Sequence, residues 1–180
     1  MWLAVAAVVS LGATPPPDWS RHAAIERLTL DLPAQPRTRI IDQRAGAETA
    51  AELDGAEIVI GVGMGLGEKA RLQVIQPLAE MLGAAICTTR DVTDAGWLPK
   101  QYQVGLTGRA IAPKLYIALG IRGAFEHMVG VRRAGVVVAV NKNAKAPVFK
   151  AADYGIVGDL AAVVPALHRH LSQVRQQKSG

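Results

Sequence analysis

The sequence contains a single cysteine, Cys87, so it cannot form a disulfide bond within the chain. Cys87 lies in the apolar run A-A-I-C-T-T, a setting that favours a thiol buried in the core over a reactive nucleophile. One unpaired core thiol fits a reducing compartment. We therefore expect a cytoplasmic protein without internal disulfide bonds.

Aromatic side chains are also scarce, at 4% of the residues, although half of all residues are hydrophobic. Ala, Val, Leu and Ile supply most of the apolar mass, and this hydrophobic content excludes an intrinsically disordered chain. Small and β-branched side chains suit a sheet that helices cover on both faces. The composition therefore indicates an α/β domain with a sizeable core.

Acidic residues are outnumbered by basic ones, which leaves a net charge of +5. The Lys and Arg residues are scattered and lack interleaved aromatic residues, so we expect no nucleic-acid partner. The one basic cluster with helical spacing, at Arg169, Arg175 and Lys178, is interpreted as a solvated helix end. A diffuse positive charge also suits a ligand that carries a diphosphate.

The sequence has no apolar run long enough to cross a membrane. Its start, M-W-L-A-V-A-A-V-V-S-L-G-A, resembles a signal peptide in composition but has no basic residues before the apolar run. We interpret it as a buried strand. We expect residues 1–36 to form an arm and linker with strands at 2–11 and 25–32, and residues 37–180 to form the main domain.

From residue 57 onward the pattern alternates between strand and helix. It predicts strands at 58–62, 84–88, 115–119, 136–140 and 156–157. It predicts helices at 68–82, 91–95 and 123–131, and a last helix with Pro165 in its first turn. Pro77 should kink the first of these helices. Repeated βα units predict a parallel sheet with right-handed crossovers, which binds ligands at the carboxyl ends of its strands.

Glycine and hydroxyl residues follow the first two predicted strands and precede the third. The loop G-V-G-M-G-L-G, at 61–67, permits close backbone approach to an anion, although tight helix–strand packing explains it nearly as well. Thr89 and Arg90 end the second strand, and the alternative for Arg90 is a surface ion pair with Asp91 or Asp94. The motif V-G-L-T-G, at 104–108, precedes the third strand.

Three further elements complete the pattern. The segment G-I-R-G-A-F-E-H, at 120–127, joins the third strand to a helix. His127 taken alone would be interpreted as an interior side chain. Asn141 ends the fourth strand, and Asp159 begins the last helix, where it can also act as an N-cap.

These motifs, in this order and spacing, resemble the carboxy-terminal FAD-binding domain of the electron transfer flavoprotein alpha subunit, over roughly residues 39–171. The resemblance implies a three-layer parallel-sheet fold of the DHS-like NAD/FAD-binding type, with a short amino-terminal β arm. It also implies that residues 1–36 are the remnant of a larger amino-terminal domain, unless the start of the sequence is misassigned.

The resemblance assigns roles to individual residues. The Thr107 hydroxyl is expected at flavin N5 and His127 at flavin O2, while Arg90 supplies a cation that raises the flavin potential. Asn141 and Asp159 are expected at the adenosine half. The full set of expected FAD-binding residues is Thr89, Arg90, Val104, Gly105, Leu106, Thr107, Arg122, Gly123, Ala124, Phe125, Glu126, His127, Asn141 and Asp159.

Three residues depart from the family pattern inside this site. Met64 stands in place of an arginine, Leu106 in place of a glutamine and Arg122 in place of a serine. Losing two polar contacts weakens binding by on the order of 100-fold. Arg122 offsets part of this loss if it pairs with the pyrophosphate, and Leu106 is interpreted as a buried residue that packs its loop.

The resemblance implies an electron carrier and not a substrate-transforming enzyme. It would hold FAD, form a heterodimer with an electron transfer flavoprotein beta-like subunit, and pass electrons from a dehydrogenase to a quinone or other oxidoreductase. One alternative is a structural subunit that has lost its flavin. A less favoured alternative is an NADP-binding domain, since G-V-G-M-G is similar to a loop of the transhydrogenase NADP domain.

Overall fold

The computed structural model describes residues 53–178, which belong to one compact unit spanning Arg44–Gly180. The arm, the linker and the two strands predicted within residues 1–36 lie outside the described residues. The last helix is described to its end at Lys178.

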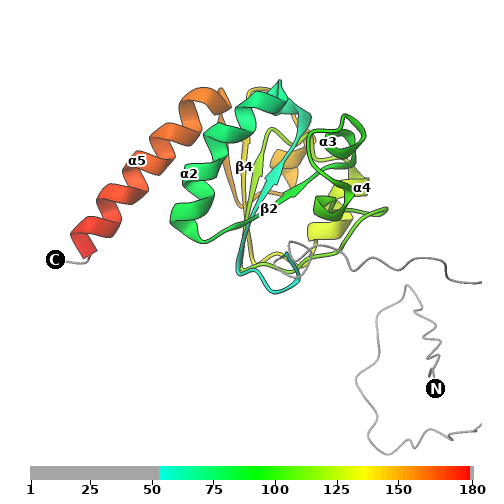
Figure 1. Cartoon of the computed structure of the whole chain (residues 1–180), viewed down its shortest axis with the longest axis horizontal. Coiled ribbons are helices and arrows are strands. Elements are labelled where there is room, and N and C mark those ends of the chain that lie inside the picture. Colours follow the sequence, from blue (N-terminus) through cyan, green and yellow to red (C-terminus); the bar gives the residue numbers. More distant parts are fainter. Residues whose placement is uncertain (1–52, 179–180) are drawn as a thin grey trace, which may run out of the picture. The chain divides into compact units, whose positions relative to one another are not determined.

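The described domain is built on one sheet of five parallel strands in the order β2-β1-β3-β4-β5 (Figure 1). All five predicted strands are confirmed. The first four differ from the prediction by at most one residue, and the fifth begins two residues earlier than expected. The strands are β1 (Ile58–Val62), β2 (Ala85–Thr88), β3 (Leu115–Leu119), β4 (Val136–Asn141) and β5 (Tyr154–Val157).

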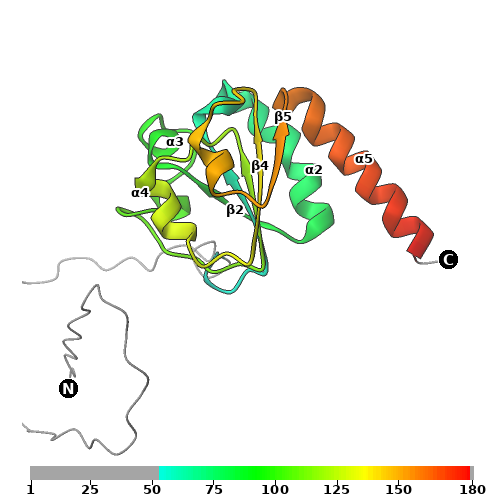
Figure 2. The same cartoon turned by 180° about the vertical axis from the view of Figure 1, so that it is seen from behind.

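Helices cover both faces of the sheet and make three layers, as predicted. Figures 1 and 2 show α2 (Leu72–Leu82) and α5 (Leu160–Lys178) together on one side and α3 (Arg90–Asp94) and α4 (Phe125–Met128) on the other. Short 3-10 turns complete the connections. They are Met64–Leu66, Lys69–Arg71, Lys100–Tyr102, Val129–Val131 and Pro147–Lys150.

Successive side chains of each central strand pack alternately into two core clusters, one on each face, as a sheet covered on both faces requires. In β3, Tyr116 and Ala118 pack into the cluster on the α4 side, whereas Ile117 and Leu119 pack into the cluster beneath α2 and α5. Cys87 is fully buried in the first of these clusters. The interpretation of Cys87 as a core thiol is therefore confirmed.

The two helix prolines differ from each other. Pro77 lies inside α2, as predicted. The prediction for Pro165 was wrong, because α5 begins at Leu160 and Pro165 therefore lies in its second turn. The helix starts earlier because the Asp159 carboxylate accepts a hydrogen bond from the Ala161 N–H at 2.9 Å and so acts as the N-cap.

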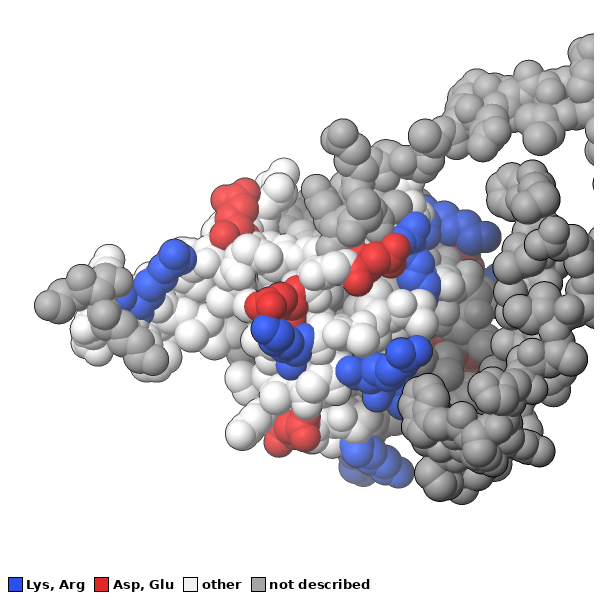
Figure 3. Space-filling model, turned by 90° about the horizontal axis from the view of Figure 1, so that it is seen from below, with Lys and Arg blue, Asp and Glu red and all other residues white. Residues whose placement is uncertain are grey.

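Charged side chains do not segregate on the face shown in Figure 3, where acidic and basic residues are interspersed. This agrees with the scattered Lys and Arg residues in the sequence. This face therefore does not carry an electrostatic field of a single sign.

Gly61 in β1 makes room for the buried ring of Tyr116 on the neighbouring strand. A Cβ atom at this position would overlap the phenol oxygen of Tyr116 and come within 2.9 Å of the Ile121 Cδ1 atom. Tyr116 is fully buried and cannot swing into solvent. The glycine is therefore a packing requirement of the core.

We predict that Gly61→Ala lowers the free energy of unfolding by roughly 1–3 kcal/mol, because it overpacks a close-packed region. Urea denaturation measures the change. Gly55→Ala is the matched control, since a Cβ at Gly55 meets no atom within 4 Å. An unchanged stability in Gly61→Ala would contradict the packing argument.

Candidate functional site

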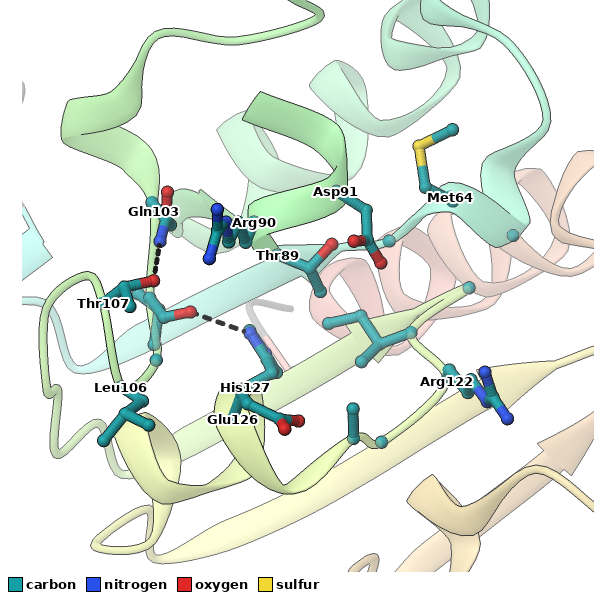
Figure 4. Close-up of a pocket in the computed structure, with 18 residues that line it drawn as sticks. Met64, Thr89, Arg90, Asp91, Gln103, Leu106, Thr107, Arg122, Glu126 and His127 are labelled. Atoms are coloured by element: carbon teal, nitrogen blue, oxygen red, sulfur yellow. Dashed lines mark hydrogen bonds between the residues drawn. The ribbon is translucent and has the colours of Figure 1, made fainter. Parts of the chain in front are cut away.

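A pocket of about 340 Å³ opens at the carboxyl ends of β1, β2 and β3 (Figure 4). In the sheet, β2 lies on one side of β1 and β3 lies on the other, so the direction in which successive strands are added reverses at β1. Open α/β sheets bind ligands at such a topological switch point. The volume falls in the range of small-molecule sites. It is at the lower end, so the pocket would enclose only part of a dinucleotide.

The pocket brings together most of the residues that the sequence predicted for it. Phe125 and Asn141 do not line it, and Asp159 lines a separate small cavity beside Arg71 and Lys142. The predicted residues that do line the pocket are Thr89, Arg90, Val104, Gly105, Leu106, Thr107, Arg122, Gly123, Ala124, Glu126 and His127.

His127 forms part of the pocket wall and is 5% exposed. Its Nδ1 lies 3.0 Å from the Val104 carbonyl oxygen, and its Nε2 lies 2.7 Å from the Tyr116 hydroxyl. Because a carbonyl only accepts, Nδ1 carries the proton and Nε2 accepts from Tyr116. Both ring nitrogens therefore have partners within the protein, which supports the reading of His127 as a satisfied interior side chain.

A buried chain of polar groups continues behind His127. The Cys87 thiol donates to the Tyr116 hydroxyl over 3.9 Å. Burial raises the pKa of Cys87 to about 12, against a smaller lowering by its hydrogen bond to Tyr116. Burial also raises the pKa of Tyr116 well above 10, so both groups stay protonated and neutral.

Burial lowers the pKa of His127 below its ordinary 6.5, and the bond to the Val104 carbonyl only partly opposes this shift. As the pH falls below 6.5, the unfolded chain therefore takes up a proton at this residue before the folded chain does. The stability that neutral His127 contributes is present above about pH 6.5 and is lost as the pH falls towards the folded pKa.

We predict that the free energy of unfolding falls more steeply below pH 6.5 in the wild type than in His127→Gln. The difference in slope is at most about 1.4 kcal/mol per pH unit, the value for one proton. Chemical denaturation at a series of pH values measures it. His170→Gln, the same substitution at an exposed position of α5, is the control. Parallel curves for the wild type and His127→Gln would contradict the assignment.

Thr107 is exposed to the pocket and is held from behind by Gln103 (Figure 4). The Gln103 Nε2 donates to the Thr107 Oγ1 at 2.8 Å, and the Thr93 hydroxyl lies 3.0 Å from the Gln103 Oε1. The Thr93 hydroxyl also lies 2.8 Å from the Arg90 carbonyl oxygen. The Thr107 side chain is therefore fixed by a chain of hydrogen bonds that reaches back to α3.

Four charged residues line the pocket, and two of them are basic and two are acidic. Arg90 is exposed and pairs with Asp94 at 3.1 Å, which confirms the surface ion pair considered as an alternative for it. Exposed pairs of this kind contribute little to stability. Arg122 has no ion pair with another described residue, while Asp91 and Glu126 place carboxylates on the same lining.

Several polar groups of the lining have no partner among the described residues. The Thr89 hydroxyl oxygen is buried and makes no hydrogen bond, and the same holds for Thr88, which does not line the pocket. The backbone N–H groups of Gly123 and Ala124 are likewise without a described partner. A buried hydroxyl left unpaired costs roughly 1–3 kcal/mol, so such groups favour a ligand that supplies the partner.

Two glycines of the loop after β1 do not offer their amides to a ligand. The N–H groups of Gly63 and Gly65 donate to the Leu119 and Gly120 carbonyls, each at 2.9 Å. A Cβ at Gly65 would lie 2.6 Å from the Gly120 carbonyl oxygen. The glycines therefore let the loops after β1 and β3 pack together, and close packing is the better explanation of this motif.

Leu106 contradicts its prediction as a buried residue. It is 63% exposed and lines the pocket at the tip of its loop. The loop is held by its backbone instead, because the Leu106 N–H donates to the Glu126 carbonyl at 2.6 Å. Gly105 permits this close approach with a φ of 135°, a region that favours glycine.

Asn141 braces two loops. Its Nδ2 donates to the Ile121 carbonyl at 2.9 Å, and its Oδ1 accepts from the Asn143 N–H at 2.9 Å. Asp159 caps α5, as the sequence allowed. The predicted contacts of both residues with an adenosine stay predictions.

Sequence reasoning missed several residues of the lining, for different reasons. Gln103 directly precedes V-G-L-T-G and lies four residues before Thr107, so its position was a usable signal. Asp91 was considered only as a partner for Arg90. The others lie inside the motifs at 61–67 and 120–127 that the sequence had singled out, but they were not among the expected FAD-binding residues. They are Gly63, Gly65, Gly120 and Ile121.

A protein-family model described as "Electron transfer flavoprotein FAD-binding domain" matches residues 52–132. The electron transfer flavoprotein subunit alpha of Thermoanaerobacterium thermosaccharolyticum is 42% identical over 139 residues, which are 77% of this chain and 42% of that protein. The alpha subunit of Paracoccus denitrificans is 48% identical over 116 residues, or 64% of this chain and 38% of that protein.

The alpha subunit of Bacillus subtilis is 41% identical over 157 residues, which are 87% of this chain and 48% of that protein. The chain belongs to the electron transfer flavoprotein alpha family. It spans less than half the length of these curated relatives. The resemblance and the α/β fold predicted from the sequence are therefore confirmed.

Within residues 53–178, no helix is both long and apolar enough to span a membrane. The same residues contain no group of three or more His, Cys, Asp or Glu side chains that could hold a metal ion.

Proposed function

We propose that this chain binds FAD in the pocket and carries electrons as the flavin-binding part of an alpha-type subunit. The observation that carries the proposal is the convergence of eleven predicted FAD-binding residues on one pocket at the switch point of the sheet. Sequence positions from Thr89 to His127 meet there. The family membership supports the same ligand.

The lining fits a flavin dinucleotide. The Thr89 hydroxyl and the N–H groups of Gly123 and Ala124 provide hydrogen bonds that no other described residue uses. Arg122, beside those two amides in sequence, provides a guanidinium without an ion pair to a described residue, and arginine binds diphosphates well. Thr107 and His127 provide a polar rim and a flat, neutral wall for a ring.

Bound FAD would supply the acceptance and release of electrons. The chain's own residues would bind and orient it. The Thr107 hydroxyl would hold the edge of the ring, neutral His127 would pack without adding charge, and Arg122 would hold the phosphates. Arg90 would act on the ring only weakly, because Asp94 neutralises much of its charge.

The remaining functional assignments follow from the family and are proposals too. The chain would pair with a beta-like subunit to form a heterodimer and would transfer electrons from a dehydrogenase to a quinone or other oxidoreductase. It would act in the cytoplasm as a carrier and would transform no substrate itself. Neither the flavin-free structural subunit nor the NADP-binding domain is favoured by the comparisons.

We predict that the protein purified with its beta-like partner is yellow and contains about one FAD per chain. Arg122→Ala should weaken FAD binding by roughly tenfold or more, because it removes a charge-assisted hydrogen bond. Absorbance gives the flavin content, and fluorescence titration of the apoprotein gives the affinity. Arg132→Ala, at another exposed arginine, is the control. A colourless complex that ignores added FAD would refute the proposal.

We also predict that Leu106→Gln tightens FAD binding by about fivefold, because an exposed pocket residue gains a hydrogen-bonding amide. Leu106→Met, which changes the shape without adding a polar group, is the matched control. The same titration measures both variants. Equal affinities for the two variants would show that position 106 does not reach the flavin.

A further inference from the structure

The charged residues of the pocket lining are not equally available to a ligand. Arg90 pairs with Asp94 at 3.1 Å, and the two side chains are 66% and 64% exposed. An ion pair acts on a third charge mainly as a dipole, and its field falls off faster with distance than that of a single charge. The positive charge of Arg90 therefore contributes little inside the pocket.

Asp91, the next residue along the chain, has no ion pair with another described residue. It lines the pocket, and Figure 4 shows its side chain reaching from α3 towards the pocket interior. The side chain is exposed, and an exposed carboxylate carries a negative charge at neutral pH. Asp91 therefore brings an uncompensated negative charge to the lining.

The position of Asp91 in α3 explains why a carboxylate is tolerated there. Asp91 lies in the first turn of this helix, where the positive end of the helix dipole favours an acidic side chain. The helix has only five residues, so few peptide dipoles add up at its start. The dipole therefore offsets only part of the charge that a ligand in the pocket meets.

We propose that Asp91 lowers the reduction potential of the flavin bound in the pocket. This inference rests on the proposed binding of FAD. Under that proposal Arg122 pairs with the diphosphate, so no unpaired cation of the described lining remains for the ring, whereas Asp91 and Glu126 do remain. Fixed negative charge repels an electron added to the ring and so favours the oxidised form.

The effect of Asp91 is opposite in sign to the one that the family resemblance implied for Arg90. It also bears on the choice of electron donor. A flavin with a lower potential accepts electrons only from a more strongly reducing donor. Asp91 would therefore narrow the class of dehydrogenases that can reduce this protein.

The deciding variant is Asp91→Asn, which removes the charge and keeps the size of the side chain. In the complex purified with the beta-like partner, we expect the affinity for the reduced flavin to rise relative to the oxidised one by roughly three- to tenfold. A tenfold rise corresponds to a potential higher by about 59 mV for a one-electron step. A spectrophotometric redox titration measures it, and an unchanged or lower potential would overturn the inference.

Two further variants separate charge from shape. Asp91→Glu keeps the charge and should keep the potential close to that of the wild type. Glu80→Gln, at an exposed position of α2 outside the pocket lining, is the matched control for removing one negative charge from the surface. If Asp91→Glu shifts the potential as far as Asp91→Asn does, side-chain contacts and not charge set the potential, and the inference fails.

The dependence on salt gives a readout that a merely structural role of Asp91 would not move. The Debye length falls from about 30 Å at 0.01 M salt to about 3 Å at 1 M. The difference in potential between the wild type and Asp91→Asn should therefore shrink as salt is added. A role confined to the start of α3 would instead change the free energy of unfolding and leave the potential as it was, which would count against the inference.

The outcomes distinguish the two proposals. A wild-type complex that binds no FAD would overturn the proposed function and this inference with it. A wild-type complex that binds FAD, with the same potential in Asp91→Asn, would overturn the inference alone.

Discussion

The hydrogen bond between the Tyr116 hydroxyl and the His127 Nε2, at 2.7 Å, joins the core of the sheet to the wall of the pocket. Gly61 leaves the space that the Tyr116 ring needs, and the Val104 carbonyl holds the other side of the imidazole. One buried bond therefore connects β1, β3, α4 and the loop at 104–108. Buried polar groups must be paired, so these elements are held in one arrangement.

The same requirement divides the site into supporting groups and binding groups. The side chains of His127 and Asn141 and the amides of Gly63 and Gly65 have protein partners, so these groups form the walls of the pocket. The Thr89 hydroxyl and the N–H groups of Gly123 and Ala124 have no hydrogen-bond partner among the described residues. The wall groups already have hydrogen-bond partners within the protein, whereas the groups that face the ligand do not. A ligand therefore need not break internal hydrogen bonds to bind, so the pocket is preorganised.

How far the sequence predicted this arrangement depends on the kind of signal. β3 was predicted to the residue, since an apolar run bounded by turn residues specifies a buried strand. The pocket residues from Thr89 to His127 were predicted from the resemblance to the family, and they meet because motifs at the ends of parallel strands lie at one edge of the sheet. The exposure of Leu106 and the bonds of His127 depend on contacts between segments distant in sequence, which a local pattern does not encode. Pro165 was misplaced for a local reason, because the N-cap at Asp159 outweighs the usual preference of proline for a first turn.

The three departures from the family pattern, at Met64, Leu106 and Arg122, are expected to affect ligand binding differently. The reason is that Coulomb attraction acts over a longer distance than a hydrogen bond does. Met64 and Arg122 line the same pocket, so the cation absent at one position is present at the other. Coulomb attraction falls off slowly with distance, and a guanidinium moved within a pocket still attracts a diphosphate. A hydrogen bond fails within a few tenths of an ångström, so no displaced group replaces the amide absent at Leu106. Under the proposed binding of FAD, the pocket would therefore keep its attraction for the diphosphate more fully than its hydrogen bonds to the edge of the ring, which would be left to Thr107.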